Sequence, residues 1–227
     1  MPDKSDYSRR DFLRVFGGTG AGLYAAAVVP ARYFGSEDGM PLAASEGFLV
    51  VDTKKCQGCV SCMLACSLAH DGAVSLSLSR IQIVQNSFEK YPDDISMAQC
   101  RQCTEPLCLE ACSTGALHVE SGSGNVKLVD EKKCIGCMKC IQACPFTPSR
   151  MEWNSAEKHA QKCDLCVDTP YHWDEAGGGP KGKQACVEVC PVEAIRFTAA
   201  VPRQEGDAGY SANLRDENWK KLGFPID

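Results

Sequence analysis

The sequence predicts an α+β fold of short strands and short helices built around loops that bind metal. Three observations predict it. Sixteen of the 227 residues are cysteines, and they fall into four groups of four. Short β-rich runs border these groups. One pattern also recurs at an offset of 78 residues, so we expect two copies of one unit.

The spacing within the groups indicates the metal. The groups are Cys56, Cys59, Cys62 and Cys66; Cys100, Cys103, Cys108 and Cys112; Cys134, Cys137, Cys140 and Cys144; and Cys163, Cys166, Cys186 and Cys190. The first and third have the spacing C-x2-C-x2-C-x3-C, a bacterial ferredoxin run whose fourth cysteine ligates the other cluster of a pair. Sixteen thiolates supply four 4Fe-4S clusters with none left over. The sequence therefore predicts tandem ferredoxin-like domains around four 4Fe-4S clusters.

Two other interpretations of the cysteines stay open. Zinc sites use paired C-x2-C knuckles, and the second and fourth groups alone resemble such knuckles. Disulfides are common in exported proteins and need only an even number of cysteines. Three cysteines within seven residues, as in groups one and three, fit neither pattern well and favour iron–sulfur clusters.

The repeat is visible around the cysteines. Residues 50–67 align with 128–145 with ten of 18 positions identical, and residues 108–117 align with 186–195. The intervening segments differ: 34 positions separate Cys66 from Cys100, but 19 separate Cys144 from Cys163. We expect two units, over 50–120 and 128–198, that diverged in their insertions.

Local patterns predict the elements. Strands are expected over residues 48–52, 80–84, 126–130 and 194–198. Short helical segments holding the fourth cysteines are expected over residues 63–69, 108–112, 140–144 and 186–190. Glycine and proline predict a loop over 168–183. The apolar core is small, so the clusters should contribute much of the folding free energy.

The N-terminal segment resembles a twin-arginine export signal. It contains the string SRRDFLR, with Arg9 and Arg10, followed by a glycine-rich apolar run from Gly17 to Val29. That run is short for a membrane-spanning helix, which needs about 20 residues. The resemblance implies export of a folded protein, and clusters assembled in the cytoplasm would require that route. We expect a signal over 1–31, a linker over 32–47 and a periplasmic location.

Composition and the remaining motifs exclude other functions. The net charge is −5 and no basic run exceeds a pair of lysines, so nucleic acid is not an expected partner. The sequence shows no nucleophile–base pair, phosphate-binding loop or pair of carboxylates. It therefore predicts no catalytic residue. We expect surface or structural roles for the histidines, His70, His118, His159 and His172. We expect solvated charges for the lysines before the cluster loops, Lys54, Lys55, Lys132 and Lys133.

The segment 199–227 lies outside the repeat. It is polar, but it keeps the apolar anchors Tyr210, Leu214, Trp219, Leu222 and Phe224. A disordered tail usually has fewer such residues. We expect a docking tail that lies on a partner or wraps back over the clusters.

The region 48–198 resembles the four-cluster iron–sulfur subunits of the dimethyl sulfoxide reductase type. It is similar also to the small subunits that accompany tungsten aldehyde oxidoreductases. The four groups occur in that family's order and spacing. The resemblance implies an electron-transfer subunit, not an enzyme on its own. Its expected partners are a large molybdenum- or tungsten-pterin oxidoreductase subunit and a membrane quinone-linked or cytochrome protein.

The resemblance also implies the ligands of each cluster, because groups one and four share two clusters and groups two and three share two. The implied sets are Cys56, Cys59, Cys62 and Cys190; Cys163, Cys166, Cys186 and Cys66; Cys100, Cys103, Cys108 and Cys144; and Cys134, Cys137, Cys140 and Cys112. A free-standing polyferredoxin, which shuttles electrons between several proteins, is the alternative function. A zinc- or disulfide-stabilised binding protein is a third.

Overall fold

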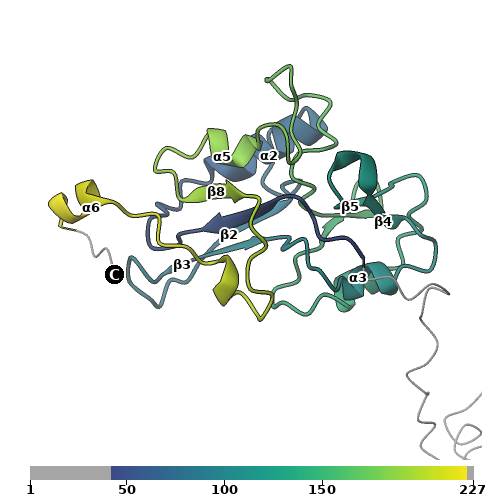
Figure 1. The fold of residues 1–227 in the computed structure, drawn as a ribbon, viewed down its shortest axis with the longest axis horizontal. Coiled ribbons are helices and arrows are strands. Elements are labelled where there is room, and N and C mark those ends of the chain that lie inside the picture. The colour runs from purple at the N-terminus through teal and green to yellow at the C-terminus, as the bar shows by residue number, and fades with distance from the viewer. Residues whose placement is uncertain (1–41, 224–227) are drawn as a thin grey trace, which may run out of the picture. The chain divides into compact units, whose positions relative to one another are not determined.

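The structure is a computed structural model that describes residues 42–223. The expected export signal, the first part of the linker and Phe224 lie outside these residues. Within them, the strands form four two-stranded antiparallel sheets joined by short helices and long loops (Figure 1). This agrees with the predicted α+β class.

One module combines the two ends of the described chain. Strand β1 (Phe48–Val51) pairs with β8 (Ile195–Thr198), so that Phe48 lies opposite Thr198. Beside this sheet, helix α2 (Ser61–Asp71) packs against α5 (Ala185–Glu188) (Figure 1). We call β1, α2, α5 and β8 the terminal module.

A second module uses only the middle of the chain. Strand β4 (Leu117–Glu120) turns through the 3₁₀ segment η1 (Ser121–Ser123) and pairs with β5 (Val126–Val129). Its helices, α3 (Leu107–Glu110) and α4 (Lys139–Gln142), pack against each other. We call these elements the middle module. Strand pairing thus crosses the repeat boundary, and one module is nested in the sequence of the other.

The segments that differ between the repeat copies are hairpins. The first pairs β2 (Ile81–Gln85) with β3 (Ile95–Gln99) through residues 86–94. The second pairs β6 (Glu152–Asn154) with β7 (His159–Gln161) through residues 155–158. The longer first hairpin accounts for much of the larger spacing between Cys66 and Cys100.

The expected elements are largely present. The four predicted strands are β1, β2, β5 and β8, and residues 168–183 form turns and bends as expected. Strands β3, β4, β6 and β7 were not predicted. Of the expected helices, only α2 contains its fourth cysteine, Cys66. Helices α3, α4 and α5 each end before Cys112, Cys144 and Cys190.

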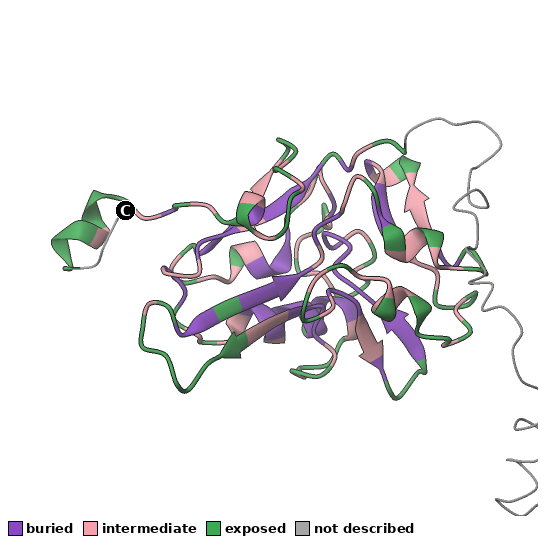
Figure 2. Ribbon diagram, turned by 90° about the horizontal axis from the view of Figure 1, so that it is seen from below, coloured by how far each residue is buried: buried purple, intermediate pink, exposed green. Residues whose placement is uncertain are grey.

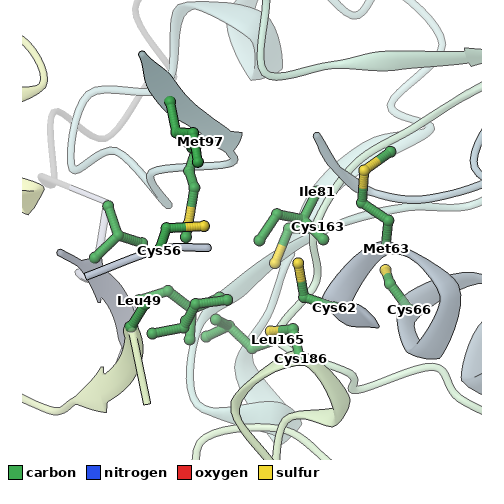
Figure 3. Packing of buried hydrophobic residues seen from close by; sticks show 14 of the residues in the cluster. Leu49, Cys56, Cys62, Met63, Cys66, Ile81, Met97, Cys163, Leu165 and Cys186 are labelled. Atoms are coloured by element: carbon green, nitrogen blue, oxygen red, sulfur yellow. The ribbon is translucent and has the colours of Figure 1, made fainter. Parts of the chain in front are cut away.

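The apolar interior consists mainly of two clusters that contain cysteines. The larger joins Leu49, Ile81 and Leu165 with thiols of groups one and four, as Figure 3 shows. The smaller surrounds Leu117 and Met151 with thiols of groups two and three. Figure 2 shows the buried residues gathered along the central strands and loops.

The C-terminal segment returns to the terminal module. Tyr210, in the 3₁₀ segment η2 (Ala208–Tyr210), is 1% exposed, and its hydroxyl donates a hydrogen bond to the carbonyl of Arg101 at 2.8 Å. The Leu214 amide donates to Asp52 Oδ2 at 2.9 Å, and Arg215 Nε lies 3.0 Å from the same oxygen. The chain therefore wraps back over the terminal module as far as Arg215, and we call residues 208–215 the strap.

Beyond this strap, helix α6 (Glu217–Lys221) extends outward and is largely exposed (Figure 2). Asp216 caps its N-terminus by accepting hydrogen bonds from the amides of Asn218 and Trp219. In residues 42–223, no helix combines the length and the apolar character that crossing a membrane requires.

Candidate iron–sulfur cluster sites

The cysteine loops depend on left-handed backbone. Gly58 and Val60 in group one have φ of +64° and +53°, and Gly136 and Met138 in group three have +69° and +58°. A β-branched residue such as Val60 adopts this conformation only at an energetic cost. Such strain is concentrated at functional sites, where the surrounding structure enforces it. The same backbone at equivalent repeat positions indicates that both loops wrap a similar object.

Each of the two loops leads into a helix. Val60 is the N-cap of α2 and Met138 is the N-cap of α4, so the third cysteine of each group lies in the first turn. Cys108 and Cys186 occupy the same place in α3 and α5. The fourth cysteine follows the third by four residues in every group.

The structure brings distant cysteine groups together. Thiols of groups one and four share the larger core cluster, which Cys100 also contacts, and thiols of groups two and three share the smaller one. Burial raises the pKa of Cys62 to about 12, and Cys56 and Cys190 raise it further. Burial likewise raises the pKa of Cys140 to about 11, with Cys112 among its charged neighbours.

The same proximity holds for the other fourth cysteines. Burial raises the pKa of Cys108 to about 12, and Cys144 contributes to the rise after Cys100 and Cys103. Burial raises the pKa of Cys186 well above its usual range, and Cys66 contributes after Cys166 and Cys163. Buried thiols of this kind lose their protons readily only to a bound metal.

The donor set fits a cluster better than the alternatives. All sixteen cysteines have free thiols. In residues 42–223, no three Cys, His, Asp or Glu side chains are grouped so that they could hold one metal ion. A small cavity is lined by four cysteines, three apolar residues and three polar ones: Cys66, Cys163, Cys166, Cys186, Leu49, Ile81, Leu165, His70, Arg80 and Gln184. Four soft thiolates around a shared cavity suit an iron–sulfur cube.

Backbone amides face the sulfurs. The fourth cysteine of every group accepts such a hydrogen bond: Arg80 N to Cys66 Sγ at 3.3 Å, Leu117 N to Cys112 Sγ at 3.3 Å, Arg150 N to Cys144 Sγ at 3.2 Å, and Ala194 N to Cys190 Sγ at 3.2 Å. Hydrogen bonds to sulfur stabilise the negative charge of a cluster and shift its potential. These amides would therefore stabilise an anionic cluster held by the fourth cysteines.

Comparison with known proteins supplies the family. A family model described as a 4Fe-4S dicluster domain matches residues 93–200. An iron–sulfur protein of Rhodospirillum rubrum is 35% identical over 70% of this chain and 85% of its own length. The B subunit of the anaerobic dimethyl sulfoxide reductase of Escherichia coli is 34% identical over 79% of this chain and 87% of its own length. The chain belongs to the family of iron–sulfur electron-transfer subunits of the dimethyl sulfoxide reductase type.

Another relative agrees with this assignment. The thiosulfate reductase electron transfer subunit of Salmonella typhi is 34% identical over 64% of this chain and 72% of its own length. Two further relatives are much longer, and the chain spans 32% and 21% of their lengths. As an iron–sulfur subunit of this family, the protein binds 4Fe-4S clusters, transfers electrons and is not the catalytic subunit.

The prediction that Lys55 is a solvated charge is wrong. Lys55 of the iron–sulfur subunit is 6% exposed, and its ammonium donates to the carbonyl of Leu214 at 3.1 Å, because the returning C-terminal segment covers it. It also lies 5.6 Å from the centre of the Trp219 ring. Lys132 and Lys133 are exposed, as expected.

Two of the histidines are buried beside acidic side chains, which fits a structural role. His70 is buried, with Nε2 2.8 Å from Asp164 Oδ1 and Nδ1 2.7 Å from the carbonyl oxygen of Cys66. His159 is buried 3.6 Å from Glu131. His118 and His172 are partly exposed.

Sequence reasoning missed a buried polar group between the modules. Gln102 is 1% exposed, and its side chain accepts from the Lys127 amide at 2.8 Å and donates to the Cys163 carbonyl at 3.0 Å. Lys162 and Lys127 are buried beside it. One signal could have found Lys162: it precedes the first cysteine of its group, as Lys55 and Lys133 do.

Proposed function

We propose that the protein carries four 4Fe-4S clusters in two nested pairs. It would relay electrons, one at a time, between a molybdenum- or tungsten-pterin catalytic subunit and a redox partner. The observation that carries this proposal is the convergence of thiols from all four sequence groups on two interior clusters. The repeat, the family match and the paired helices all support it.

We propose the ligand sets that the family resemblance implies, and the proximity of the thiols supports them. In the terminal module, one cube would use Cys56, Cys59, Cys62 and Cys190, and its mate Cys163, Cys166, Cys186 and Cys66. In the middle module, one would use Cys100, Cys103, Cys108 and Cys144, and the other Cys134, Cys137, Cys140 and Cys112. Packing of α2 on α5 and of α3 on α4 supports this pairing, since each fourth cysteine lies in one of these helices or within two residues of its end.

Exposure supports an order for the electron path. Cys59 and Cys137 are the only two exposed thiols of the sixteen. The cubes that contain them would therefore be the ends of the path. Cys163 and Cys100, from the other two sets, are close enough that Cys100 raises the pKa of Cys163 after burial and Asp164. The other two cubes would then form the middle of the path.

The catalytic partner is inferred from the relatives. Those relatives are named as parts of dimethyl sulfoxide, thiosulfate and tetrathionate reductases. We propose that α6 and the residues after it form the docking tail, because Leu222 is 70% exposed at the end of an outward helix. Co-purification with a large pterin-containing chain would support a subunit, and a chain that always purifies alone would support the free polyferredoxin.

Export of the folded protein completes the proposal. Changing Arg9 and Arg10 to lysine should leave brown, cluster-loaded protein in the cytoplasm, while the unchanged chain reaches the periplasm. Cell fractionation with iron analysis measures this. A double variant that still reaches the periplasm would exclude the twin-arginine signal.

Metal content and cysteine variants test the clusters directly. Anaerobically purified protein should hold about 16 irons and 16 acid-labile sulfides. Zinc without sulfide would end the electron-transfer proposal. Cys190→Ser should damage the cube of Cys56, Cys59 and Cys62 and spare the one formed by its own sequence neighbours. Cys66→Ser is the matched variant for the other cube of that module.

Electron paramagnetic resonance distinguishes these outcomes. Each variant should lose or alter one signal and leave the signals of the middle module unchanged. If Cys190→Ser instead alters a cube of groups two and three, the nested pairing is wrong although the cluster count stands.

A further inference from the structure

Two lysine side chains are buried between the modules. Lys127, on β5, is 1% exposed, and Lys162, directly after β7, is 3% exposed. Lysine is almost never fully buried without a charged partner. Their positions therefore need a specific explanation.

No carboxylate supplies that partner. Lys162 Nζ donates to the carbonyl of Cys163 at 2.8 Å and to the carbonyl of Lys127. Lys127 Nζ is buried and makes no hydrogen bond. In the described part of the chain, neither ammonium lies within 4.0 Å of an acidic side chain. An unpaired buried charge is costly, so both amines stay charged only where another negative group compensates them.

The thiolates of the group-two cysteines are the negative groups that would compensate the two ammonium groups. Burial lowers the pKa of Lys127, and Lys162 lowers it further, while Cys100, Cys103 and Cys108 raise it. The charge of Lys162 also acts on Cys103 and Cys108. The charges of the two lysines therefore act on thiols of the group-two loop, which Gln102 joins to the Lys127 backbone.

Gln102 holds this arrangement in place. Its amide hydrogen points to Cys100 Sγ at 3.5 Å, and its side chain links the Lys127 amide to the Cys163 carbonyl. The residue has a φ of +49°, which is unusual for a non-glycine residue, and it is 1% exposed. The Lys127 backbone, to which Lys162 Nζ also donates, is therefore tied to the group-two loop.

The neighbouring inner set has different surroundings. Asp164 is buried and held by His70, and its charge acts on Cys163, Cys166 and Cys66. Arg80 acts on Cys66 in the opposite direction. The two inner sets thus differ in the charge that faces them: two lysines at one, and a mixed acidic and basic environment at the other.

We propose that Lys127 and Lys162 are the permanent counter-charges of the cube bound by Cys100, Cys103, Cys108 and Cys144, and that they raise its reduction potential above that of the other inner cube. The proposal rests on the proposed cluster assignment. Reduction adds one electron to a cube that is already anionic and breaks no bond. A fixed positive charge nearby stabilises the reduced form more than the oxidised one. An electron that reaches the inner pair would therefore settle on the group-two cube.

Lys127→Met tests this in the full, anaerobically purified chain. Methionine has a similar length and no charge, and Lys127 Nζ has no hydrogen bond to lose. In a redox titration followed by electron paramagnetic resonance, one of the four signals should move to lower potential. At the unmodified protein's midpoint, its reduced-to-oxidised ratio should fall at least tenfold, which corresponds to 59 mV for one electron. Lys162→Met should move the same signal.

Lys133→Met is the matched control. Lys133 also precedes a cluster cysteine, but its side chain is 64% exposed, so solvent screens its charge. Its removal should change no ratio by more than about twofold. Iron and sulfide are measured in each variant. Full cluster content with an unmoved potential in Lys127→Met would overturn the proposal, because the amine would then be neutral or distant.

A variant that loses one or more cubes also tests the proposal. Loss of only the group-two cube in Lys127→Met supports a counter-charge without which that cube does not form. Loss of all cubes is a folding defect, and Lys127→Gln then replaces it in the same titration with the same criterion. Absence of iron and sulfide from the unmodified protein would contradict the cluster assignment itself, and this outcome is distinct from failure of the lysine proposal.

Discussion

The cysteine loops around Cys56 and Cys134 have the same sequence pattern and backbone conformation, but different segments of the chain pack against them. Both place glycine and then an apolar residue in left-handed backbone, at Gly58 and Val60 and at Gly136 and Met138. Local sequence therefore determines the loop itself. What differs is the cover over each loop.

Two segments hold the group-one loop. The C-terminal strap covers Lys55, and Tyr91, in the connection of the long hairpin, donates to the Lys54 carbonyl at 3.1 Å. Gln57 donates to the Tyr91 hydroxyl at 3.3 Å. The group-three loop is more open at its first cysteine: Cys134 is half-buried where Cys56 is buried, and Lys133 is exposed where Lys55 is buried. Hairpin length and the strap, not the cysteine motif, decide how open each end of the electron path is.

Tyr210→Ala should have the largest effect on this difference. The ring is buried, lies 4.7 Å from the Arg101 guanidinium and anchors the strap over the terminal module. Truncating a buried aromatic side chain costs about 3–5 kcal/mol. The urea midpoint of cluster loss, followed anaerobically by visible absorbance, should fall accordingly, and the group-one cube should bleach first. Retained stability would show that the strap does not hold this loop.

Alanine at the two loop glycines should have a smaller and unequal effect. Left-handed backbone costs a non-glycine residue about 1–2 kcal/mol at both positions. At Gly136 the new Cβ would also lie 2.8 Å from the Lys158 carbonyl oxygen, whereas at Gly58 it would lie 3.2 Å from Ile95 Cδ1, a side-chain end that can move. Gly136→Ala should therefore lower the urea midpoint more. The reverse order would contradict the placement of the short hairpin against the group-three loop.

Lys55→Met and Lys133→Met compare the same repeat position in the two loops. Removing Lys55 leaves the buried Leu214 carbonyl without its donor and should cost about 1–3 kcal/mol. Lys133 is solvated, and its loss should change stability by less than about 0.5 kcal/mol. Urea titration of both variants measures this. Equal effects would mean that the strap contributes nothing at Lys55.

The smallest expected effect is a pH dependence of stability that comes from Glu152 in the short hairpin. Burial raises the pKa of Glu152 on β6 to about 7, against the lowering effect of Arg150. The unfolded value is about 4.3. The folded state therefore binds more protons between these values, so the contribution of Glu152 to stability is greatest below about pH 4 and falls as pH rises to about 7. After solvent screening we expect a loss of about 1 kcal/mol. Glu152→Gln should remove this slope, and an unchanged slope would assign it to another group.

The cysteine groups, the bordering strands and the long loop could be predicted because each depends on local spacing. The anchors Tyr210 and Leu214 were also visible as apolar residues in a polar segment, and both are buried. The burial of Lys55 and the contact of His70 with Asp164 were not visible. They join residues 94 or more positions apart, and no local pattern records which distant segment will cover a side chain. Helices α3, α4 and α5 are also shorter than predicted, because each ends within about a turn of its third cysteine.

The pairing of β1 with β8 has a consequence for biosynthesis. The ribosome completes every element of the middle module before it begins α5 and β8. That module can close while the rest of the chain is still being made. Cysteines of α2 and its preceding loop are made first but must wait for the last strand before their surroundings exist. The terminal module can therefore close only after the chain has been synthesised as far as Thr198, later than the middle module.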